Sequence, residues 1–303
     1  MAVTRPLYGG VELGGTKCVC ILGAGPGDVR EQTSVPTGDD PARVLLRIET
    51  IIGGWVTRHG PIEALGVASF GPIDLAVGSP TFGFIRATSK PGWRDTDVAK
   101  RLGRACGVPV GCDTDVNAAA IAEGRWGAAR GLADYAYVTV GTGVGVGLVV
   151  NGRTVQGFSH PECGHIRIAR RLDDAWSGSC PFHGDCVEGL ASGPAIAARA
   201  GRATETLSDD DPVWEYAADA LAQLLHTLML TAAPRRILIG GGVVAARPGL
   251  LPLIHRRLTR SLGGYFDLDA LIGAVDSYAC APGLGERAGP LGALALAAGA
   301  IGR

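Results

Sequence analysis

The sequence predicts an α/β protein of two domains, and three observations lead to this prediction. Short β-like runs alternate with amphipathic helical segments along the chain, which is the pattern of α/β folds. The chain has 303 residues, more than one hydrophobic core usually serves. A strand–turn–strand pattern with a Gly/Thr turn occurs at residues 11–19 and again at 138–146. A duplicated domain with a nucleotide cleft between the copies would explain this repeat; coincidence in a glycine-rich chain is the alternative.

The first half of the chain is predicted to contain strands and helices in alternation. The expected strands are Gly10–Leu13, Cys18–Leu22, Ala64–Ala68 and Val108–Cys112. The expected helices are Pro41–His59, Asp97–Cys106 and Val116–Trp126. In the first of these helices the apolar residues recur at helical spacing and therefore share one face.

The second half repeats the alternation. The expected strands are Tyr135–Val140, Val144–Val150, Arg236–Ile239 and Ile272–Val275. The expected helices are Trp214–Thr231, with its leucines on one side, and an Ala/Leu-rich closing helix at Pro290–Ile301.

Composition narrows the class of function. Apolar residues make up 47% and charged residues 19% of the chain, which fits a packed globular protein. The formal net charge is −1, so no nucleic-acid partner is expected. The sequence shows neither a signal peptide nor an apolar run of about 18 residues, so we expect a cytoplasmic protein without a membrane partner. In that compartment the eight cysteines are expected to be reduced, as core residues or metal ligands.

The first Gly/Thr turn is a candidate phosphate site. Backbone N–H groups of Gly14 and Gly15 can approach phosphate oxygens closely, Thr16 adds a hydroxyl donor and Lys17 a positive charge. Glu12, just before the turn, could help to hold a hydrated magnesium ion. The spacing is not that of a Walker A loop, and an ordinary hairpin turn is the alternative interpretation.

The second turn, Gly141-Thr142-Gly143, repeats this chemistry, and the two turns could grip a triphosphate from both sides. Glycine in a strand interior also marks bulges and close packing, which is the structural alternative. The run Gly240-Gly241-Gly242 follows a strand and could let an adenine ring pass over bare backbone. By itself it is a common strand-to-helix turn.

An acidic segment stands where the strand ending at Cys112 meets the next helix. Phosphoryl transfer needs positioning, a metal ion and a base that accepts the proton of the attacking hydroxyl. An aspartate at a strand end fits the role of this base, and spacing alone leaves Asp113 and Asp115 as competitors. Helix N-capping is the structural alternative.

A cluster of soft and borderline metal ligands is the sharpest pattern in the chain. Its members are His165, Cys180, His183 and Cys186. Four such ligands satisfy tetrahedral zinc, and the loop that carries them is rich in Gly, Ser and Pro and has little to bury. Cys163 and His160 are rival ligands, and a disulfide between Cys180 and Cys186 is disfavoured by the compartment. Glu162 and Glu188 flank the cluster and could accept hydrogen bonds from sugar hydroxyls.

Together these segments resemble the ROK family of sugar kinases over nearly the whole length, and within it the bacterial fructokinase branch. The matching segments are ELGGTK at 12–17, FGPID at 70–74, TDVNAAAIAEG at 114–124, HPECGHI at 160–166, CPFHGDC at 180–186 and EGLASGPAI at 188–196. Many glucokinases of the family have Asn where this chain has Thr114, and the family's usual metal motif has a cysteine where this chain has His183. Both departures match the fructokinase branch.

The resemblance assigns roles to individual residues. It implies Asp115 as the general base and the cluster His165, Cys180, His183 and Cys186 as zinc ligands. It implies a sugar side formed by Gly71, Thr114, Glu162 and Glu188. It implies a nucleotide side formed by Gly14, Gly15, Thr16, Lys17, Gly141, Thr142, Gly143, Pro194, Gly241 and Gly242.

The resemblance also implies a fold and an activity. The fold is the two-lobed ribonuclease-H-like fold of actin, hexokinase and Hsp70-type ATPases, with a zinc-stabilised loop. Residues 1–118 would form a smaller N-terminal lobe, joined by the closing helix 287–303, and residues 119–286 a larger lobe. The implied activity is phosphorylation of D-fructose with ATP, Mg²⁺ and Zn²⁺, by a homodimer. The alternatives are a glucokinase, mannokinase or N-acetylhexosamine kinase, and more remotely a sugar-responsive regulator, whose DNA-reading domain has no room before residue 12.

Overall fold

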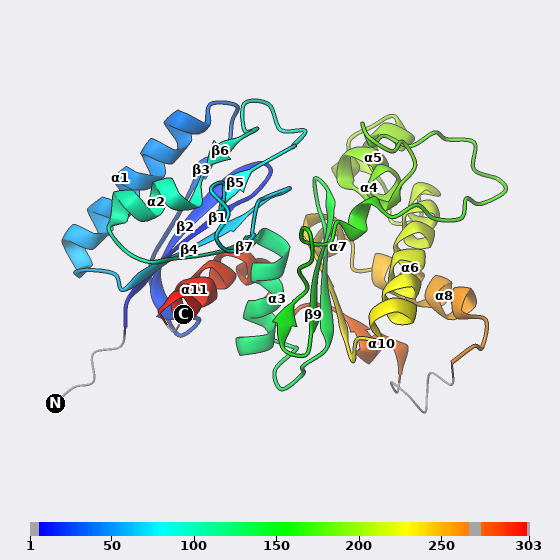
Figure 1. Ribbon diagram of the computed structural model, residues 1–303. Helices are drawn as coiled ribbons and strands as arrows, with labels where there is room; N and C mark the ends of the chain where they lie inside the picture. The colour runs from blue at the N-terminus through cyan, green and yellow to red at the C-terminus, as the bar shows by residue number, and fades with distance from the viewer. Residues whose placement is uncertain (1–5, 267–273, 302–303) are drawn as a thin grey trace. The chain divides into compact units, whose positions relative to one another are not determined.

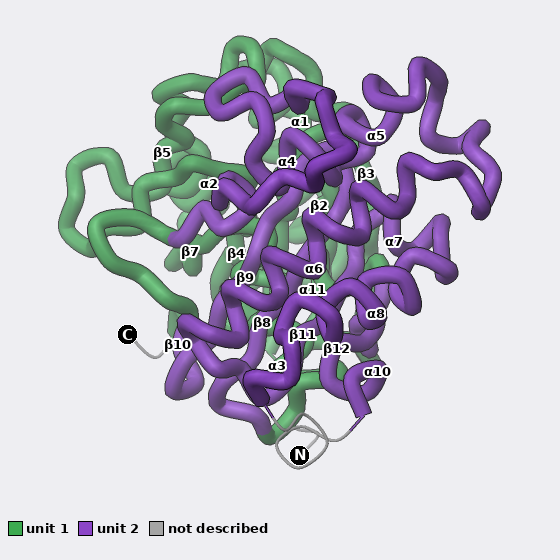
Figure 2. The backbone as a smooth tube through the Cα atoms, turned by 90° about the vertical axis from the view of Figure 1, so that its right-hand side faces the viewer, with its two compact units in different colours: residues 1–131, 154–160, 286–303 green, residues 132–153, 161–285 purple. Residues whose placement is uncertain are grey.

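The structure is a computed structural model that describes residues 6–266 and 274–301, and the chain divides into two compact units (Figure 2). Unit 1 comprises residues 1–131, 154–160 and 286–303, and unit 2 comprises 132–153 and 161–285. The resemblance implied a lobe boundary at residue 118, which falls within helix α3 (Asp115–Trp126), and this helix belongs to unit 1.

Unit 1 is built on a five-stranded mixed sheet (Figure 1). In spatial order its strands are β3 (Asp28–Pro36), β2 (Lys17–Gly25), β1 (Tyr8–Leu13), β4 (Ala64–Ser69) and β7 (Val110–Thr114). Strand β1 is antiparallel to β2 and parallel to β4, and β7 continues the parallel part. A separate two-stranded ribbon consists of β5 (Phe84–Ile85) and β6 (Thr96–Asp97). The carboxyl ends of β1, β4 and β7 therefore lie at one edge of the sheet.

Helices cover both faces of this sheet, and strand alternation decides which residues meet them. On one face large apolar residues such as Val11 and Val67 join the core formed with α1 (Pro41–His59) and α2 (Ala99–Cys106). On the other face the strands present small residues to α11 (Ala288–Ala300). A Cβ on Gly66 would overlap the carbonyl oxygen of Ala293, so this glycine lets the helix lie directly on the sheet. The closing helix therefore belongs to unit 1.

Unit 2 contains a second five-stranded sheet with the same strand order. Its strands are β10 (Arg153–Thr154), β9 (Val144–Val150), β8 (Tyr135–Val140), β11 (Ile237–Gly240) and β12 (Ala279–Cys280). Strand β8 is antiparallel to β9 and parallel to β11, just as β1 is antiparallel to β2 and parallel to β4. The shared order supports duplication, rather than coincidence, as the origin of the sequence repeat.

The helices of unit 2 are mostly short, apart from two. They are η1 (Cys163–His165), α4 (Val187–Ala191), α5 (Gly193–Ala200), η2 (Thr204–Thr206), α6 (Val213–Ala232), α7 (Gly242–Ala246), α8 (Leu250–Leu262), α10 (Val275–Tyr278) and η3 (Gly285–Arg287), which runs into unit 1. Helix α6 packs on α4, α5 and α8. No helix among residues 6–266 and 274–301 is long and apolar enough to cross a membrane.

Most predicted elements are present, several with the predicted bounds. Helix α1 and strands β8 and β9 match their predictions residue for residue. The prediction of a late strand at Ile272–Val275 is wrong. Its first two residues lie outside the described part of the chain, Val275 begins α10, and the strand of this region is β12. Asp276 and Ser277 separate the apolar residues that suggested a strand from β12, so the strand was placed too early in the sequence.

Candidate active site and metal cluster

The acidic segment lies at the carboxyl end of β7, where α3 begins. The carboxylate of Asp113 is buried, and both of its oxygens are occupied. Oδ1 accepts hydrogen bonds from the N–H of Thr114 at 2.8 Å and the amide of Asn117 at 2.7 Å. Oδ2 accepts one from the hydroxyl of Thr154 at 3.0 Å. Asp113 therefore fixes the turn between strand and helix, which leaves Asp115 as the better base of the two competitors.

Asp115 lies in a different environment. It is half-buried as the first residue of α3, and Oδ1 accepts a hydrogen bond from the N–H of Val116 at 2.9 Å. Burial raises the pKa of Asp115 to about 6, against the hydrogen bonds from the backbone, which lower it. A carboxylate with a pKa close to neutrality is suited to accept and release a proton. Thr114, predicted on the sugar side, is buried, and its hydroxyl caps α3 by accepting the N–H of Asn117 at 3.1 Å.

Glu12 brings a second carboxylate into the electrostatic environment of Asp115. It lies near the end of β1, just before the first Gly/Thr turn. Burial raises the pKa of Glu12 to about 7, the charge of Asp115 adds to this rise, and Lys17 counteracts it. The carboxylates of Glu12 and Asp115 and the ammonium group of Lys17 thus lie at one edge of the sheet in unit 1. Such a pair of carboxylates could bind a divalent cation.

The first Gly/Thr turn is fixed by hydrogen bonds, and its last three residues are exposed to solvent. The N–H of Gly14 donates to the carbonyl of Lys17 at 3.1 Å, and the buried hydroxyl of Thr37 donates to the carbonyl of Gly14 at 2.7 Å. Gly15, Thr16 and Lys17 are exposed. The turn is therefore rigid while its predicted phosphate-binding residues remain accessible.

The second Gly/Thr turn follows β8 in unit 2 and contacts two other predicted segments. The N–H of Gly141 donates to the carbonyl of Gly143 at 2.9 Å and closes the turn. The N–H of Gly193, the first residue of α5, donates to the carbonyl of Gly141 at 2.8 Å. The carboxylate of Glu188 accepts the N–H of Val144 at 3.1 Å. The turn, the start of α5 and Glu188 thus form one connected group.

The glycine run at the end of β11 packs against the same turn. Gly241 has a φ of 92°, and a Cβ there would overlap the backbone of Val140, so only glycine fits. Pro194 is exposed in the first turn of α5, which Ser192 caps by accepting the N–H of Ala195 at 3.3 Å. The structure therefore gathers the unit 2 segments predicted for the nucleotide around the carboxyl ends of β8 and β11.

The four predicted metal ligands come together, and the rival ligands stay apart from them. The ligand atoms of His165, Cys180, His183 and Cys186 all lie within 4.8 Å of one another. All eight cysteines are free thiols. Cys163 does not belong to the cluster, and His160 belongs to unit 1, where it accepts the N–H of Ile73 at 3.1 Å.

The spacing within the cluster fits a tetrahedral zinc ion. Nδ1 of His165 lies 3.7 Å from Sγ of Cys180 and 3.6 Å from Sγ of Cys186, and Nδ1 of His183 lies 3.7 Å from Sγ of Cys180. Zinc bonds of about 2.3 Å to sulfur and 2.05 Å to nitrogen separate the two atoms of a tetrahedron by about 3.6 Å. The donor set is the one zinc prefers. Nε2 of His165 lies 3.9 Å from Oε1 of Glu188, which places this glutamate next to the cluster without a direct hydrogen bond.

The remaining predicted sugar-side residues are on loops. Glu162 is exposed and immediately precedes η1, and Gly71 is half-buried on the loop after β4. Sequence reasoning did not predict the structural role of two residues on this side of unit 1, which it had named only as a rival metal ligand and within the segment FGPID. One is His160, and the other is Asp74, which accepts hydrogen bonds from the hydroxyls of Ser79 and Thr81, both at 2.6 Å. No sequence signal predicts the partner of His160.

Comparisons with known proteins agree with this arrangement. The model of the ROK family matches residues 8–300. A fructokinase from Pediococcus pentosaceus is 38% identical over 97% of this chain and 99% of its own length, and one from Zymomonas mobilis is 38% identical over 97% of each. Among solved structures, a ROK family glucokinase from Streptomyces griseus, in complex with glucose and AMPPNP, superposes with a TM-score of 0.75 and 25% identity, covering 97% of this chain and 99% of that one.

Proposed function

The chain belongs to the ROK family, and from this premise we propose that it is an ATP-dependent fructokinase that phosphorylates D-fructose at the 6-hydroxyl. Two fructokinases that match nearly the whole chain support fructose as the acceptor. Thr114 and His183, which depart from the glucokinase pattern, favour the same acceptor. The observation that carries the transfer step is the environment of Asp115, whose half-buried carboxylate has a pKa of about 6.

In the proposed reaction Asp115 accepts the proton of the attacking sugar hydroxyl as its oxygen bonds to the γ-phosphorus of ATP. The bond from that phosphorus to the β,γ-bridging oxygen breaks, and ADP leaves. Its position at the start of α3 is fixed because Asp113 and the cap by Thr114 hold the preceding turn. Around neutral pH Asp115 is ionised and ready to accept the proton. The proton then leaves to water while the phosphate product dissociates.

The two Gly/Thr turns are the proposed phosphate-binding elements. Gly14 to Lys17 in unit 1 and Gly141 to Gly143 in unit 2 supply N–H groups and hydroxyls to the phosphates of ATP, and the segment with Pro194, Gly241 and Gly242 supports the adenine. Mg²⁺, when bound, neutralises charge on the transferring phosphoryl group. Glu12 is the side chain we assign to the hydrated ion, because it lies beside the first turn.

Zinc is the proposed structural metal of the loop in unit 2. The loop around Cys180 and Cys186 has little apolar surface, so a bound metal would stabilise it. The same ion would hold His165 beside Glu188, a proposed sugar ligand, and Glu162 stands three residues before His165.

A panel of hexoses tests this proposal. ADP release is measured by a coupled assay with fructose, mannose, glucose and N-acetylhexosamines, in the presence of MgATP. We expect the highest kcat/KM for fructose, and the absence of fructose turnover would overturn the proposal. The panel is repeated after strong chelation with excess magnesium restored, which separates the contributions of the two metals.

The same panel decides between fructokinase and the alternatives within the family. The solved structure with glucose and AMPPNP keeps a glucokinase as the second candidate, because its fold matches this chain throughout. Preference for glucose over fructose would favour that candidate. A homodimer, as is usual in the family, is also proposed, and sedimentation equilibrium of the purified protein tests it.

A further inference from the structure

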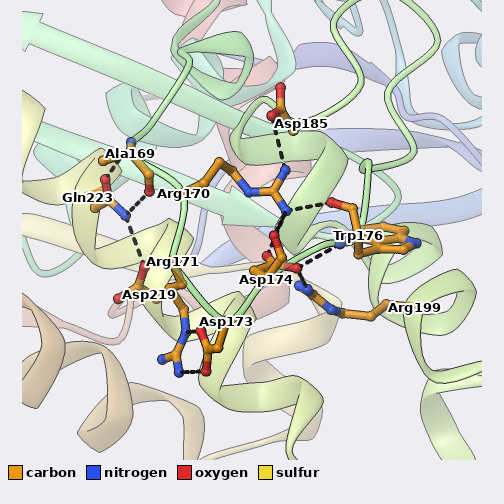
Figure 3. Close-up of polar contacts among 10 residues, drawn as sticks. All are labelled: Ala169, Arg170, Arg171, Asp173, Asp174, Trp176, Asp185, Arg199, Asp219 and Gln223. Carbon is orange, nitrogen blue, oxygen red and sulfur yellow. Dashed lines mark hydrogen bonds and ion pairs between the residues drawn. The ribbon is translucent and has the colours of Figure 1, made fainter.

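A charged network involves residues of the metal loop of unit 2, and its centre is Asp174 (Figure 3). The side chain of Asp174 is only 5% exposed. Oδ2 pairs with Arg170 at 2.8 Å, and Oδ1 pairs with Arg199 and accepts the N–H of Trp176 at 3.0 Å. One buried carboxylate thus compensates two guanidinium groups.

Arg170 joins the two ends of the loop that carries the metal ligands. Besides Asp174 near the beginning, it pairs through Nη1 with Asp185 at 3.0 Å, and Asp185 immediately precedes the ligand Cys186. Its Nη2 also donates to the carbonyl of Trp176 at 2.5 Å. The conformation of the loop therefore depends on this arginine as well as on the metal ligands.

Arg199 joins the network to the nucleotide side. It extends from α5, and its guanidinium lies over the ring of Tyr216 on α6 at 3.8 Å and over the ring of Trp176 at 5.1 Å. The first residue of α5, Gly193, is the one that donates its N–H to Gly141 of the second Gly/Thr turn. A continuous set of contacts thus leads from the metal loop through Asp174 and α5 to this turn.

Burial of these charged groups costs free energy that their mutual pairing must offset. Burial would raise the pKa of Asp174, but the N–H of Trp176 and the two arginines outweigh it and lower this pKa below its ordinary value. Nε of Arg170 and Nη1 of Arg199 are buried without a hydrogen-bond partner within the described residues. Asp174 pairs with both guanidinium groups, and Asp185 pairs with that of Arg170. Removing one member of a buried ion pair leaves an uncompensated charge, which forces the structure around it to rearrange.

We propose that Asp174 is a positioning residue that couples the metal loop to the second Gly/Thr turn, so that zinc in the loop tightens nucleotide binding at the turn. The loop is the element with two states. Held by zinc, it places Asp174 against Arg199 and fixes α5. Without zinc the loop loses the ion that orders it, Asp174 moves, and α5 no longer supports Gly141 through Gly193. The zinc in the loop and the nucleotide at the turn are both taken from the proposed function.

Calorimetric titration with MgAMPPNP tests the coupling without turnover. The dissociation constant is measured on zinc-loaded protein and on protein stripped by a chelator that is then removed. We expect zinc to tighten nucleotide binding by about fivefold or more, the lower end of measured coupling factors. Because coupling is reciprocal, MgAMPPNP should raise the affinity for zinc by the same factor, which equilibrium competition with a chromogenic chelator measures.

Two variants and a control locate the coupling. In Asp174→Asn zinc should no longer change the nucleotide affinity. The control Asp173→Asn should keep the zinc effect, because Asp173 pairs with Arg171 at the surface and its side chain is 55% exposed. Arg199→Lys keeps the charge, loses the forked geometry and should lower the factor in part. This variant gives the answer if Asp174→Asn does not fold.

The outcomes separate this inference from the proposed function. If wild-type protein binds MgAMPPNP equally well with and without zinc, the coupling is overturned and the kinase assignment stands. If the coupling is present but persists in both Asp174→Asn and Arg199→Lys, the role of Asp174 is overturned. If no form of the protein binds MgAMPPNP, both the coupling and the proposed function are overturned.

Discussion

The carboxylate of Glu12 lies so close to the Cα atom of Gly289 that a Cβ at position 289 would overlap it. Glu12 is near the end of β1, and Gly289 is in the first turn of α11, the closing helix. The end of the chain therefore leaves room for the carboxylate proposed to stand beside the magnesium ion. The clashing group is the end of a side chain, so the fold can tolerate a change that the site cannot.

Gly289→Ala should displace the carboxylate of Glu12 while the protein remains folded. We expect kcat/KM for MgATP to fall roughly 10- to 100-fold, since displacements of about 1 Å in an active site have effects of this size. The control is Gly299→Ala in the same helix, where a Cβ meets no atom within 4 Å. Steady-state kinetics of both variants check this, and equal activity of the two would contradict the role of Glu12.

Asp115 should control the acid limb of the pH profile. The base must be ionised, so kcat/KM for the sugar should fall as the pH drops through about 6. Asp115→Asn should lower kcat by roughly 10²- to 10⁴-fold and leave sugar affinity largely intact. A variant that retains both the activity and the acid limb would show that another group is the base. Asp113→Asn is the comparison, and it should mainly lower stability, because three hydrogen bonds converge on Asp113.

Asp115→Asn should also increase the stability of the protein at high pH. The pKa of Asp115 is raised from 3.8 to about 6 in the folded protein, so the folded state holds the proton more tightly than the unfolded state. Ionisation of Asp115 therefore destabilises the folded state. This destabilisation is absent below pH 3.8 and fully present above pH 6. Asp115→Asn should be more stable than the wild type by up to about 3 kcal/mol at pH 8 and little different at pH 3.5. Urea unfolding at both pH values measures this, and a variant less stable at pH 8 would contradict it.

The sequence could predict what depends on local pattern. The bounds of α1 follow from its apolar stripe and from Asp40, which caps it, and the metal cluster follows from four ligands close together in sequence. Strand β3 was missed because Asp28–Pro36 is mostly polar and exposed and pairs only with β2 at the sheet edge. The network of Asp174 depends on residues of the loop and of α5 whose pairing no spacing reveals.

Loss of one metal ligand should release the metal. The wild type is expected to retain about one zinc per chain, and Cys180→Ser should lose it and become more sensitive to proteolysis within the loop 173–185. The control is Cys163→Ser, because Cys163 lies near the cluster in sequence but outside it in space. Zinc content by atomic emission and the absorption bands of a cobalt-substituted protein distinguish the two. Retention of metal by Cys180→Ser with unchanged cobalt bands would rule out the assigned ligand set.

His160 should act on the sugar and not on the nucleotide. Its Nε2 accepts the N–H of Ile73 from the loop that resembles the sugar-side loop of the family, 87 residues away in sequence. Without this acceptor a buried N–H is left unsatisfied at a cost of about 1–3 kcal/mol, so in His160→Ala the KM for fructose should rise roughly 5- to 100-fold while the KM for MgATP stays within about twofold. His160→Gln, which offers an acceptor oxygen, should recover part of the loss, and His226→Ala, a histidine bonded to Ser261 at the surface, should have no effect. A parallel rise of both KM values in His160→Ala, without recovery by glutamine, would show that the residue serves only folding, because a general loss of structure does not discriminate between the two substrates.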